Sequence, residues 1–493
     1  MDSADTGDEL HTGQIVEPPL VEGPINGTAF TAYASFDLAA LGYLEEEYFL
    51  SGQAQAYEID GARGSDGRWS VSPSPAGAAV YTTRIVVRRP LDAHRFNGTV
   101  TVEWLNVSAG TDSEPDWACT HRHLIREGFA WVGISAQKAG IDGGGLAAGP
   151  HLKSVDPDRY KTLNHPGDAF SYDIFSQAGR VLRDSRERGP LGPLSPARVI
   201  AMGESQSAAF LVTYINAIDP VARVYDGYLV HGRGAAGANF DGFRTSPVTT
   251  VGGSAPDPAA ARAAAARIGE RIRDDVRVPV LTLQSETDVA SMGGGLARSL
   301  DGERFRLWEV AGAAHADTYL IKGAFQDTGA IGADELAAAL APTAEVHGFN
   351  TGTPINSGPQ QHYVSQAALA QLDSWVRGGA APSEAARLEL TEEGSAFVAD
   401  QHGIALGGIR TPWVDVPVAV LSGLGQEGGA GFTFLFGTTR AFSAQQLGQL
   451  YPGGRDSYLK QFGESLAQAV NRGFILEADA AEIKLLAAAA YPE

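Results

Sequence analysis

The sequence has almost no cysteine and no long hydrophobic run. Cys119 is the only cysteine among 493 residues, so no disulfide can form within the chain, and redox chemistry or a thiolate metal site is not expected. No stretch of 18 apolar residues occurs that could cross a bilayer. The first ten residues are acidic and lack the basic start and apolar core of a signal sequence. We therefore expect a cytoplasmic protein, with the reservation that a removed signal sequence leaves no trace.

Positive charge is also in short supply. The chain has 37 lysines and arginines against 58 aspartates and glutamates, a net charge of −21 that is spread along the sequence. This balance argues against nucleic acid or an anionic membrane as a partner, and a solvated acidic surface explains it better. The residue spacings of zinc, calcium and phosphate-loop sites are missing too, so we expect no metal. Nothing in the sequence indicates an oligomeric state.

Short strand-like and helix-like segments alternate along the chain. Segments that are nearly continuous in apolar residues, as strands buried on both faces are, lie at 99–107, 129–135, 198–202, 227–230, 278–284 and 305–310. Helical patterns intervene at 117–127, 169–186 and 207–218. This alternation predicts an α/β fold with a mostly parallel sheet flanked by helices. Before it, 43–59 and 78–89 have the β-branched and aromatic residues of antiparallel strands.

The remaining segments suggest a division of the chain. Residues 1–30 are polar and rich in proline and glycine, and we expect a flexible arm. Residues 31–385 then form the core, with a cap inserted at about 234–275 that contains an Ala/Arg-rich helix, 258–273. A long Gly/Asp/Pro loop, 137–168, leaves the carboxyl end of a strand, where ligands of α/β proteins bind. Residues 386–493 form a C-terminal extension.

The most informative stretch is Val-Ile-Ala-Met-Gly-Glu-Ser-Gln-Ser-Ala-Ala-Phe, residues 199–210. An apolar strand ends at Gly203, Ser205 follows, and a helical pattern begins at once, as in a nucleophile elbow. Such a turn lifts the serine hydroxyl above the edge of the sheet, beside the unpaired N–H groups of the helix start. Ser207 stands where the usual pattern has its second glycine, which weakens the motif without breaking it.

A nucleophilic serine needs a base, and the base needs an acid that orients it. In parallel-sheet hydrolases both follow the serine on loops after later strands, the acid first. The strand 278–284 is followed by Asp288, our candidate acid, with Glu286 as the alternative. The strand 305–310 is followed by small residues and then His315, whose loop can curl back over the sheet. We therefore predict a Ser205–Asp288–His315 triad.

Two further groups of residues complete the expected site. The backbone N–H groups of Gln206 and Val107, with Asn106 as the next candidate, are expected to form the oxyanion hole. The alternative is that the loop 106–112 is a turn that only caps the next helix. The candidate residues for the pocket walls are Trp104, Trp117, Tyr160, His231 and Phe240. The alternative is that these residues belong to the protein core.

At several motifs the sequence resembles a bacterial family called the alpha/beta-hydrolase domain family, which is grouped with carboxylesterases. The resemblance covers roughly residues 40–493 and lies in these motifs: Val-Glu-Trp-Leu-Asn-Val-Ser (102–108), His-Pro-Gly-Asp (165–168), Gly-Glu-Ser-Gln-Ser (203–207), Gln-Ser-Glu-Thr-Asp-Val (284–289), Leu-Trp-Glu-Val-Ala-Gly (307–312) and Gly-Gly-Ile-Arg-Thr-Pro-Trp (407–413). It implies an alpha/beta-hydrolase fold with cap insertions and a C-terminal section that belongs to the family fold. It also implies serine esterase activity without a cofactor, and that a serine at position 207 is normal.

The expected activity is that of a serine carboxylesterase. Through an acyl-enzyme, Ser205, His315 and Asp288 are expected to hydrolyse small to medium uncharged esters, because an acidic surface disfavours polyanionic ones. Acyl transfer to an alcohol, or cleavage of lactones or amides, uses the same triad and stays open. A binding protein without catalysis is the alternative of a different class, and it is disfavoured because the sequence keeps all three triad residues.

Overall fold

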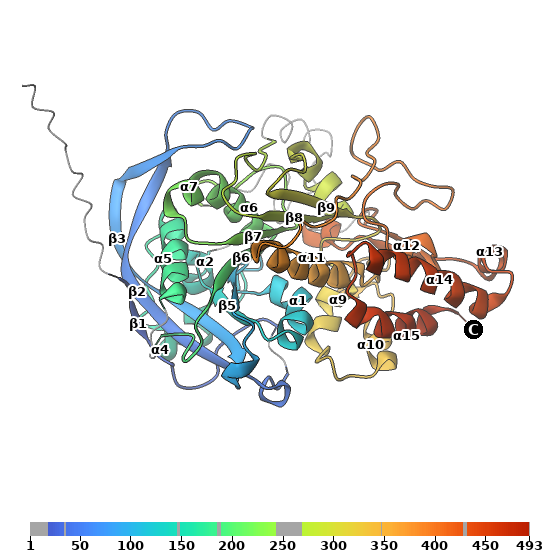
Figure 1. Cartoon of the computed structure of the whole chain (residues 1–493), viewed down its shortest axis with the longest axis horizontal. Coiled ribbons are helices and arrows are strands. Elements are labelled where there is room, and N and C mark those ends of the chain that lie inside the picture. Colours follow the sequence, from blue (N-terminus) through green and yellow to red (C-terminus); the bar gives the residue numbers. More distant parts are fainter. Residues whose placement is uncertain are drawn as a thin grey trace, which may run out of the picture.

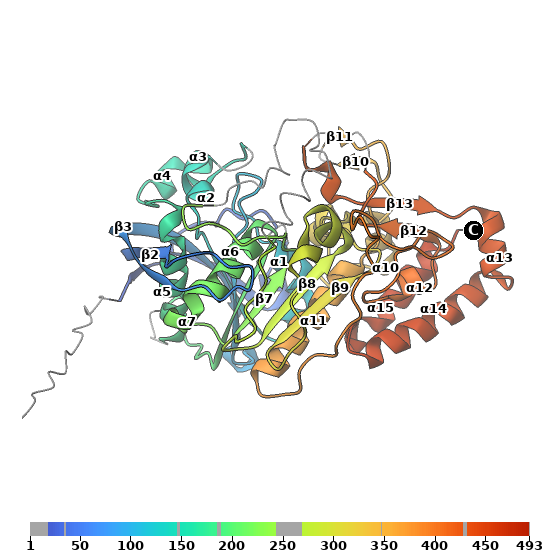
Figure 2. The ribbon, with the colours of Figure 1, turned by 90° about the horizontal axis from the view of Figure 1, so that it is seen from above.

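The computed structural model describes residues 18–33, 36–144, 148–184, 189–242, 269–346, 348–426 and 431–492. Its centre is a sheet of nine strands in the order β1-β2-β3-β5-β4-β6-β7-β8-β9 (Figure 1). A long hairpin lies at one end of the molecule, and helices from the C-terminal part of the chain lie at the other end (Figures 1 and 2).

The antiparallel end of the sheet is built from β1 (Leu20–Glu22), β2 (Tyr43–Ile59) and β3 (Val71–Pro90). The register between β2 and β3 pairs Tyr43 with Pro90. Because β1 pairs with β2, residues 20–22 of the expected N-terminal arm form an edge strand of the sheet. Further along, the backbone N–H groups of Ala32 and Tyr33 each donate to the carboxylate of Glu114 at 3.1 Å. The prediction of a flexible arm over residues 1–30 was therefore wrong for Leu20–Glu22.

Six parallel strands form the rest of the sheet. They are β4 (Thr99–Trp104), β5 (Ala130–Ile134), β6 (Arg198–Glu204), β7 (Gly227–His231), β8 (Val280–Ser285) and β9 (Phe305–Val310). Almost every residue in them is buried, as their continuous apolar sequence predicted. Since all six run in one direction, their carboxyl ends meet at one edge of the sheet, and the loops that follow β6, β8 and β9 start there.

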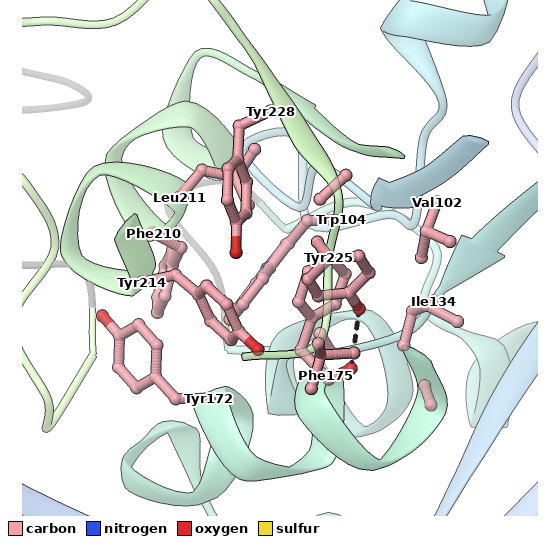
Figure 3. Close-up of a cluster of buried hydrophobic side chains, with 14 of the residues drawn as sticks. Val102, Trp104, Ile134, Tyr172, Phe175, Phe210, Leu211, Tyr214, Tyr225 and Tyr228 are labelled. Carbon is pink, nitrogen blue, oxygen red and sulfur yellow. Dashed lines mark hydrogen bonds between the residues drawn. The ribbon is translucent and has the colours of Figure 1, made fainter. Parts of the chain in front are cut away.

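One face of the sheet is covered by α5 (Ser171–Arg183) and by α6 (Gln206–Thr213), which continues into a π-helical turn (Tyr214–Ile218) and α7 (Asp219–Ala222). Aromatic side chains fill this interface (Figure 3). Phe175 lies 4.7 Å from Trp104 and 4.9 Å from Tyr225 between ring centroids. We call this the aromatic face.

The opposite face is covered by α1 (Pro115–Arg126) and α11 (Gln360–Val376). Leu124 of α1 and Leu369 of α11 pack there with Leu229 of β7 and Leu283 of β8. Near the carboxyl edge the apolar residues on this side give way to ionisable ones, which are described below. We call this the α1/α11 face.

The predicted loop 137–168 contains three short helices, α2 (Lys138–Asp142), α3 (Leu152–Val155) and α4 (Pro157–Tyr160). Most of the predicted cap, including the larger part of its helix 258–273, lies outside the described residues. Single turns of 3₁₀ helix occur at Ala39–Leu41, Ala93–Arg95, Asp168–Phe170, Gly294–Ala297, Gly323–Phe325, Gly431–Leu435 and Glu477–Asp479.

Several short elements follow β9. Before α11 these are α9 (Thr318–Ile321), α10 (Ala333–Ala339), β10 (Glu345–Val346) and β11 (Phe349–Asn350). After α11 come α12 (Pro412–Asp415), β12 (Ala419–Ser422), β13 (Thr438–Ala441), α13 (Ala444–Leu450), α14 (Gly454–Asn471) and α15 (Ala480–Ala490).

The C-terminal section packs on the core through one apolar cluster. Phe462 of α14 and Ile483 of α15 belong to the same cluster as Cys119 of α1 and Tyr319 of α9. The Gly-Gly-Ile-Arg-Thr-Pro-Trp motif joins the sheet, because Ile409 forms a parallel bridge with Val310 of β9. The motif therefore packs against the core. Within the described ranges, no helix is long and apolar enough to cross a membrane.

Candidate active site

The turn between β6 and α6 holds Ser205 in a strained backbone conformation. Its φ is 59° and its ψ is −115°, a region that residues with a side chain rarely adopt. The conformation is fixed from both sides, since Ser205 N–H donates to the His231 carbonyl at 2.9 Å and Ala209 N–H donates to the Ser205 carbonyl at 3.1 Å. Gly203 permits the close approach of strand and helix, because a Cβ there would lie 3.1 Å from the Ser207 Cβ.

His315 is carried by the loop that follows β9. Gly312 in this loop has a φ of 69°, and a Cβ on it would lie 2.4 Å from a methyl of Val414, so the turn requires glycine. The backbone N–H of His315 donates to the Thr287 hydroxyl at 3.2 Å, which ties this loop to the one after β8. The small residues before the histidine therefore let the loop turn back over the sheet edge.

The three predicted triad side chains lie in one hydrogen-bonded line. The Ser205 Oγ is 2.9 Å from the His315 Nε2, and the His315 Nδ1 is 2.5 Å from the Asp288 Oδ1. The second oxygen of Asp288 accepts hydrogen bonds from the backbone N–H (2.6 Å) and hydroxyl (2.8 Å) of Ser285. Because Asp288 is anchored by these donors, it holds the imidazole with Nε2 toward the serine.

Glu286, the alternative acid, has a different set of contacts. Its Oε1 accepts the N–H of Gly312 at 2.6 Å. Its Oε2 accepts the N–H of Gly423 at 2.8 Å and the hydroxyl of Ser422 at 3.0 Å. Glu286 therefore joins the His315 loop to the C-terminal section, and Asp288 is the carboxylate of this pair that contacts the imidazole.

A carboxylate that the sequence analysis missed also contacts His315. The Glu204 Oε1 lies 2.9 Å from the His315 Nε2, on the same nitrogen that faces Ser205. Asn106 Nδ2 donates to the Glu204 carbonyl at 3.0 Å and to its Oε2 at 3.3 Å. The position of Glu204 directly before Ser205, as the last residue of β6, is the signal that could have identified it.

A second imidazole–carboxylate pair lies beside the first. His231 ends β7 opposite Glu204 in the sheet register, and its Nδ1 is 2.9 Å from the Asp116 Oδ1 in the first turn of α1. Both side chains are buried, and the other oxygen of Asp116 has no hydrogen-bond partner. Asp116 was not predicted, because its place near His231 depends on how α1 packs on the sheet.

These buried charges shift one another's protonation. Burial alone would lower the pKa of His315, but the negative charges of Glu204 and Asp288 raise it to about 10. For His231, burial is likewise outweighed by Asp116, and its pKa is raised. Burial raises the pKa of Asp317, two residues beyond His315, to about 7. The α1/α11 face thus holds several carboxylates and two imidazoles that favour the cationic form.

Of the three expected oxyanion donors, the N–H groups of Val107 and Asn106 are occupied. Gln206 is the first residue of α6, so its N–H has no acceptor within the helix. The Val107 N–H donates to the side-chain Oε1 of Gln206 at 3.3 Å. The Asn106 N–H donates to the Ser113 carbonyl at 2.9 Å, and its side chain is bound to Glu204. An oxygen that binds the Val107 N–H must therefore displace the Gln206 side chain.

Of the five candidate pocket residues, His231 is the one beside the triad. Trp104 is buried on the aromatic face against Phe210, at 4.9 Å between ring centroids. Trp117 packs with Trp131 at 5.3 Å under α1.

The other two candidates also lie in packed surroundings. Tyr160 donates to Glu47 at 3.0 Å and belongs to a separate apolar cluster. Phe240 packs on Tyr172 at 4.9 Å. The structure thus places four of the five among packed side chains. Among the described residues, no group of three or more His, Cys, Asp or Glu side chains could hold a metal ion.

Comparison with known proteins gives a family and a set of distant structural likenesses. The family model described as alpha/beta hydrolase domain matches residues 16–484. The chain is similar to a putative dienelactone hydrolase from Klebsiella pneumoniae (12% identity, 53% of this chain and 85% of that chain, TM-score 0.25). It is also similar to a cold-adapted esterase from an Arctic intertidal metagenomic library (13% identity, 53% of this chain and 84% of that chain, TM-score 0.26). An esterase from Pyrococcus furiosus is similar as well (10% identity, 57% of this chain and 87% of that chain, TM-score 0.29).

No curated protein matches the chain. The structural likenesses have TM-scores too low to support an argument, and the assignment rests on the family model together with the sheet and its loops. The match spans nearly the whole length, including the C-terminal section. The chain therefore belongs to the alpha/beta-hydrolase domain family.

Proposed function

We propose that this hydrolase is a serine carboxylesterase that works through an acyl-enzyme. The observation that carries the proposal is the line from the Ser205 Oγ through the His315 imidazole to the Asp288 carboxylate, with distances of 2.9 and 2.5 Å. A serine in this geometry can lose its proton to the imidazole as it attacks a carbonyl carbon.

In the proposed reaction His315 takes the Ser205 proton while the ester carbonyl becomes a tetrahedral oxyanion. Asp288 supports the positive charge that forms on the imidazole. The oxyanion is bound by the N–H groups of Gln206 and Val107, and for the second of these it replaces the Gln206 side-chain oxygen. His315 then protonates the leaving alcohol. A water molecule that the same histidine activates releases the acid.

The proposed substrates are small to medium uncharged esters. The carboxylates of Glu204 and Asp288 both contact His315, so an anionic acyl group would meet two negative charges against the one positive charge of the imidazolium. The net charge of −21 disfavours polyanionic substrates further. Transfer of the acyl group to an alcohol, and cleavage of lactones or amides, remain alternatives with the same triad.

The test is labelling by a fluorophosphonate, measured as intact mass, together with turnover of a series of p-nitrophenyl esters. Wild type should gain one adduct and Ser205→Ala none. Ser207→Ala is the matched control, because the Ser207 hydroxyl is buried without a hydrogen-bond partner and lies two residues after Ser205 in the chain. Product analysis with a competing alcohol separates hydrolysis from transfer. No adduct and no turnover in wild type would contradict the proposal and favour a ligand-binding role.

A further inference from the structure

Two different groups lie within hydrogen-bond distance of the same nitrogen of His315. The Ser205 Oγ and the Glu204 Oε1 each lie 2.9 Å from Nε2. Glu204 is 5% exposed, and Asn106 binds both its side chain and its backbone carbonyl. The carboxylate is therefore held at the reacting nitrogen and cannot turn out to water.

We propose that Glu204 is a positioning residue that accepts a hydrogen bond from the protonated Nε2 of His315. It thereby sets the pH at which His315 becomes a base. The inference rests on the proposed function, in which His315 is that base. It assigns a role to the glutamate of the Gly-Glu-Ser turn that the triad alone does not require.

Glu204 acts on two stages of the reaction. In the resting protein the protonated imidazole donates to Glu204, and Ser205 keeps its own proton. As the pH rises, the Nε2 proton leaves to solvent and His315 can accept the Ser205 proton. During attack the Oγ–carbon bond forms, the carbonyl electron pair moves to its oxygen, and the proton moves from Oγ to Nε2. Glu204 then stabilises the imidazolium until its proton passes to the leaving alcohol.

The charges around His315 support this assignment. Asp288 occupies the other nitrogen, Nδ1. Asp116 on α1 lies close by, but its negative charge is balanced by His231 on β7, whose Nδ1 is 2.9 Å from the Asp116 Oδ1. In the same loop as His315, Asp317 has its pKa raised to about 7 by burial.

The Tyr33 hydroxyl and the Cys119 thiol lie within electrostatic range of Glu204, and both stay uncharged because burial raises the pKa of each. The negative charges left uncompensated at His315 are therefore those of Glu204 and Asp288. Together they raise its pKa to about 10 against the effect of burial.

The first experiment compares the pH dependence of kcat/KM in wild type, Glu204→Gln and Asp116→Asn, using p-nitrophenyl acetate with the uncatalysed rate subtracted. In Glu204→Gln the rising limb should move to lower pH by about one unit or more, because one unit corresponds to a tenfold change in proton affinity. Its plateau should fall about tenfold, since the imidazolium loses a stabilising charge. The wild-type and Glu204→Gln curves should therefore cross.

Asp116→Asn is the matched control, because it removes a buried negative charge from the same face without touching His315. The rising limb of its pH profile should move by less than half of the shift seen in Glu204→Gln. An equal shift in both variants would show a general field effect and overturn the contact that we propose. Glu204→Asp keeps the charge but draws it back from Nε2, so its limb should fall between wild type and Glu204→Gln.

The second experiment needs no substrate. The titration of His315 is followed by NMR in full-length protein labelled at histidine, with the signal assigned by its loss in His315→Asn. The midpoint should be lower in Glu204→Gln than in wild type. If no ester is turned over but this midpoint moves, the esterase proposal fails while the role of Glu204 stands. An unchanged midpoint in both glutamate variants would overturn the role of Glu204.

Discussion

The two faces of the sheet differ in what they bury. The aromatic face, under α5 and α6, is packed with rings such as Phe175, Tyr225 and Trp104 (Figure 3). The α1/α11 face holds apolar residues along most of the strands, but at the carboxyl edge it buries Glu204 and His231. The same strands thus support both a dry core and a charged site, because alternate residues point to opposite faces.

This difference implies a division of labour. Side chains on the aromatic face should contribute to stability through the area that they bury. Side chains at the charged edge should contribute to the rate and its pH dependence, while burial of their charges costs stability. Each of the following variants tests this division, in order of the size of the expected effect.

The largest effect is expected from the triad. Ser205→Ala and His315→Ala should each lower kcat by about 10⁴-fold or more, and the double variant should lose little beyond either one, because the residues act as a unit. Steady-state kinetics on a p-nitrophenyl ester measures this, with thermal unfolding to show that the fold is kept. Losses that multiply in the double variant would argue against a single catalytic unit.

A large effect on stability is expected from Phe175→Ala on the aromatic face. This ring is fully buried among Trp104, Tyr214 and Tyr225. Its removal should lower the free energy of unfolding by about 3–5 kcal/mol, from lost transfer energy and the cavity left behind. Urea unfolding measures the loss. The pH profile of kcat/KM should stay as in wild type, and a displaced profile would mean that the two faces are not separate.

Asp317→Asn should change the pH dependence of stability. Folding raises the pKa of this group from 3.8 to about 7, so the folded state favours the protonated form. Its contribution to stability is present below pH 3.8 and is lost as the pH rises through 7. The variant should therefore be more stable than wild type at pH 8, with the advantage shrinking toward pH 4.

Asparagine can still accept the Leu320 N–H that Asp317 caps at 3.0 Å. Urea unfolding at both pH values decides, and a variant less stable at pH 8 would contradict the expectation.

The smallest effect is expected from Gln206→Ala. The side-chain oxygen of Gln206 occupies the Val107 N–H in the free protein. Removal of the side chain leaves the Val107 N–H open to the oxyanion. The change in kcat/KM should stay within about tenfold, because the free energy of about one hydrogen bond is involved. Gln206→Glu is the contrasting variant, because a charge at the same place should slow the reaction. A loss of 10² or more in Gln206→Ala would mean that the side chain itself binds substrate.

The fold and the placement of Ser205, Asp288 and His315 at one edge of the sheet could be predicted because both follow from local patterns. Six apolar runs gave six buried strands, and the loops after β6, β8 and β9 carried Ser205, Asp288 and His315 to one edge. The distinction between Asp288 and Glu286 needed the structure, since both lie within the same short loop.

The rest of the site depends on packing between distant segments. Glu204 and His231 meet because β6 and β7 pair in register, and Asp116 joins them because α1 packs over that edge. Trp117 and Tyr160 were expected in a pocket, but whether an aromatic residue faces a core or a cavity is not encoded in its neighbours along the chain. The edge strand Leu20–Glu22 was missed for the same reason, because its partner lies on β2.

The Glu286 contacts have a consequence for how the protein is made. The loop that carries His315 is tied through Glu286 to Gly423, and the Ala316 N–H donates to the Leu435 carbonyl at 3.0 Å. When the chain up to His315 has left the ribosome, the residues that hold the His315 loop in place have therefore not yet been synthesised. The nascent chain can fold its sheet early, but the hydrogen-bonded line from Ser205 to Asp288 should form only after Gly423 and Leu435 have been added.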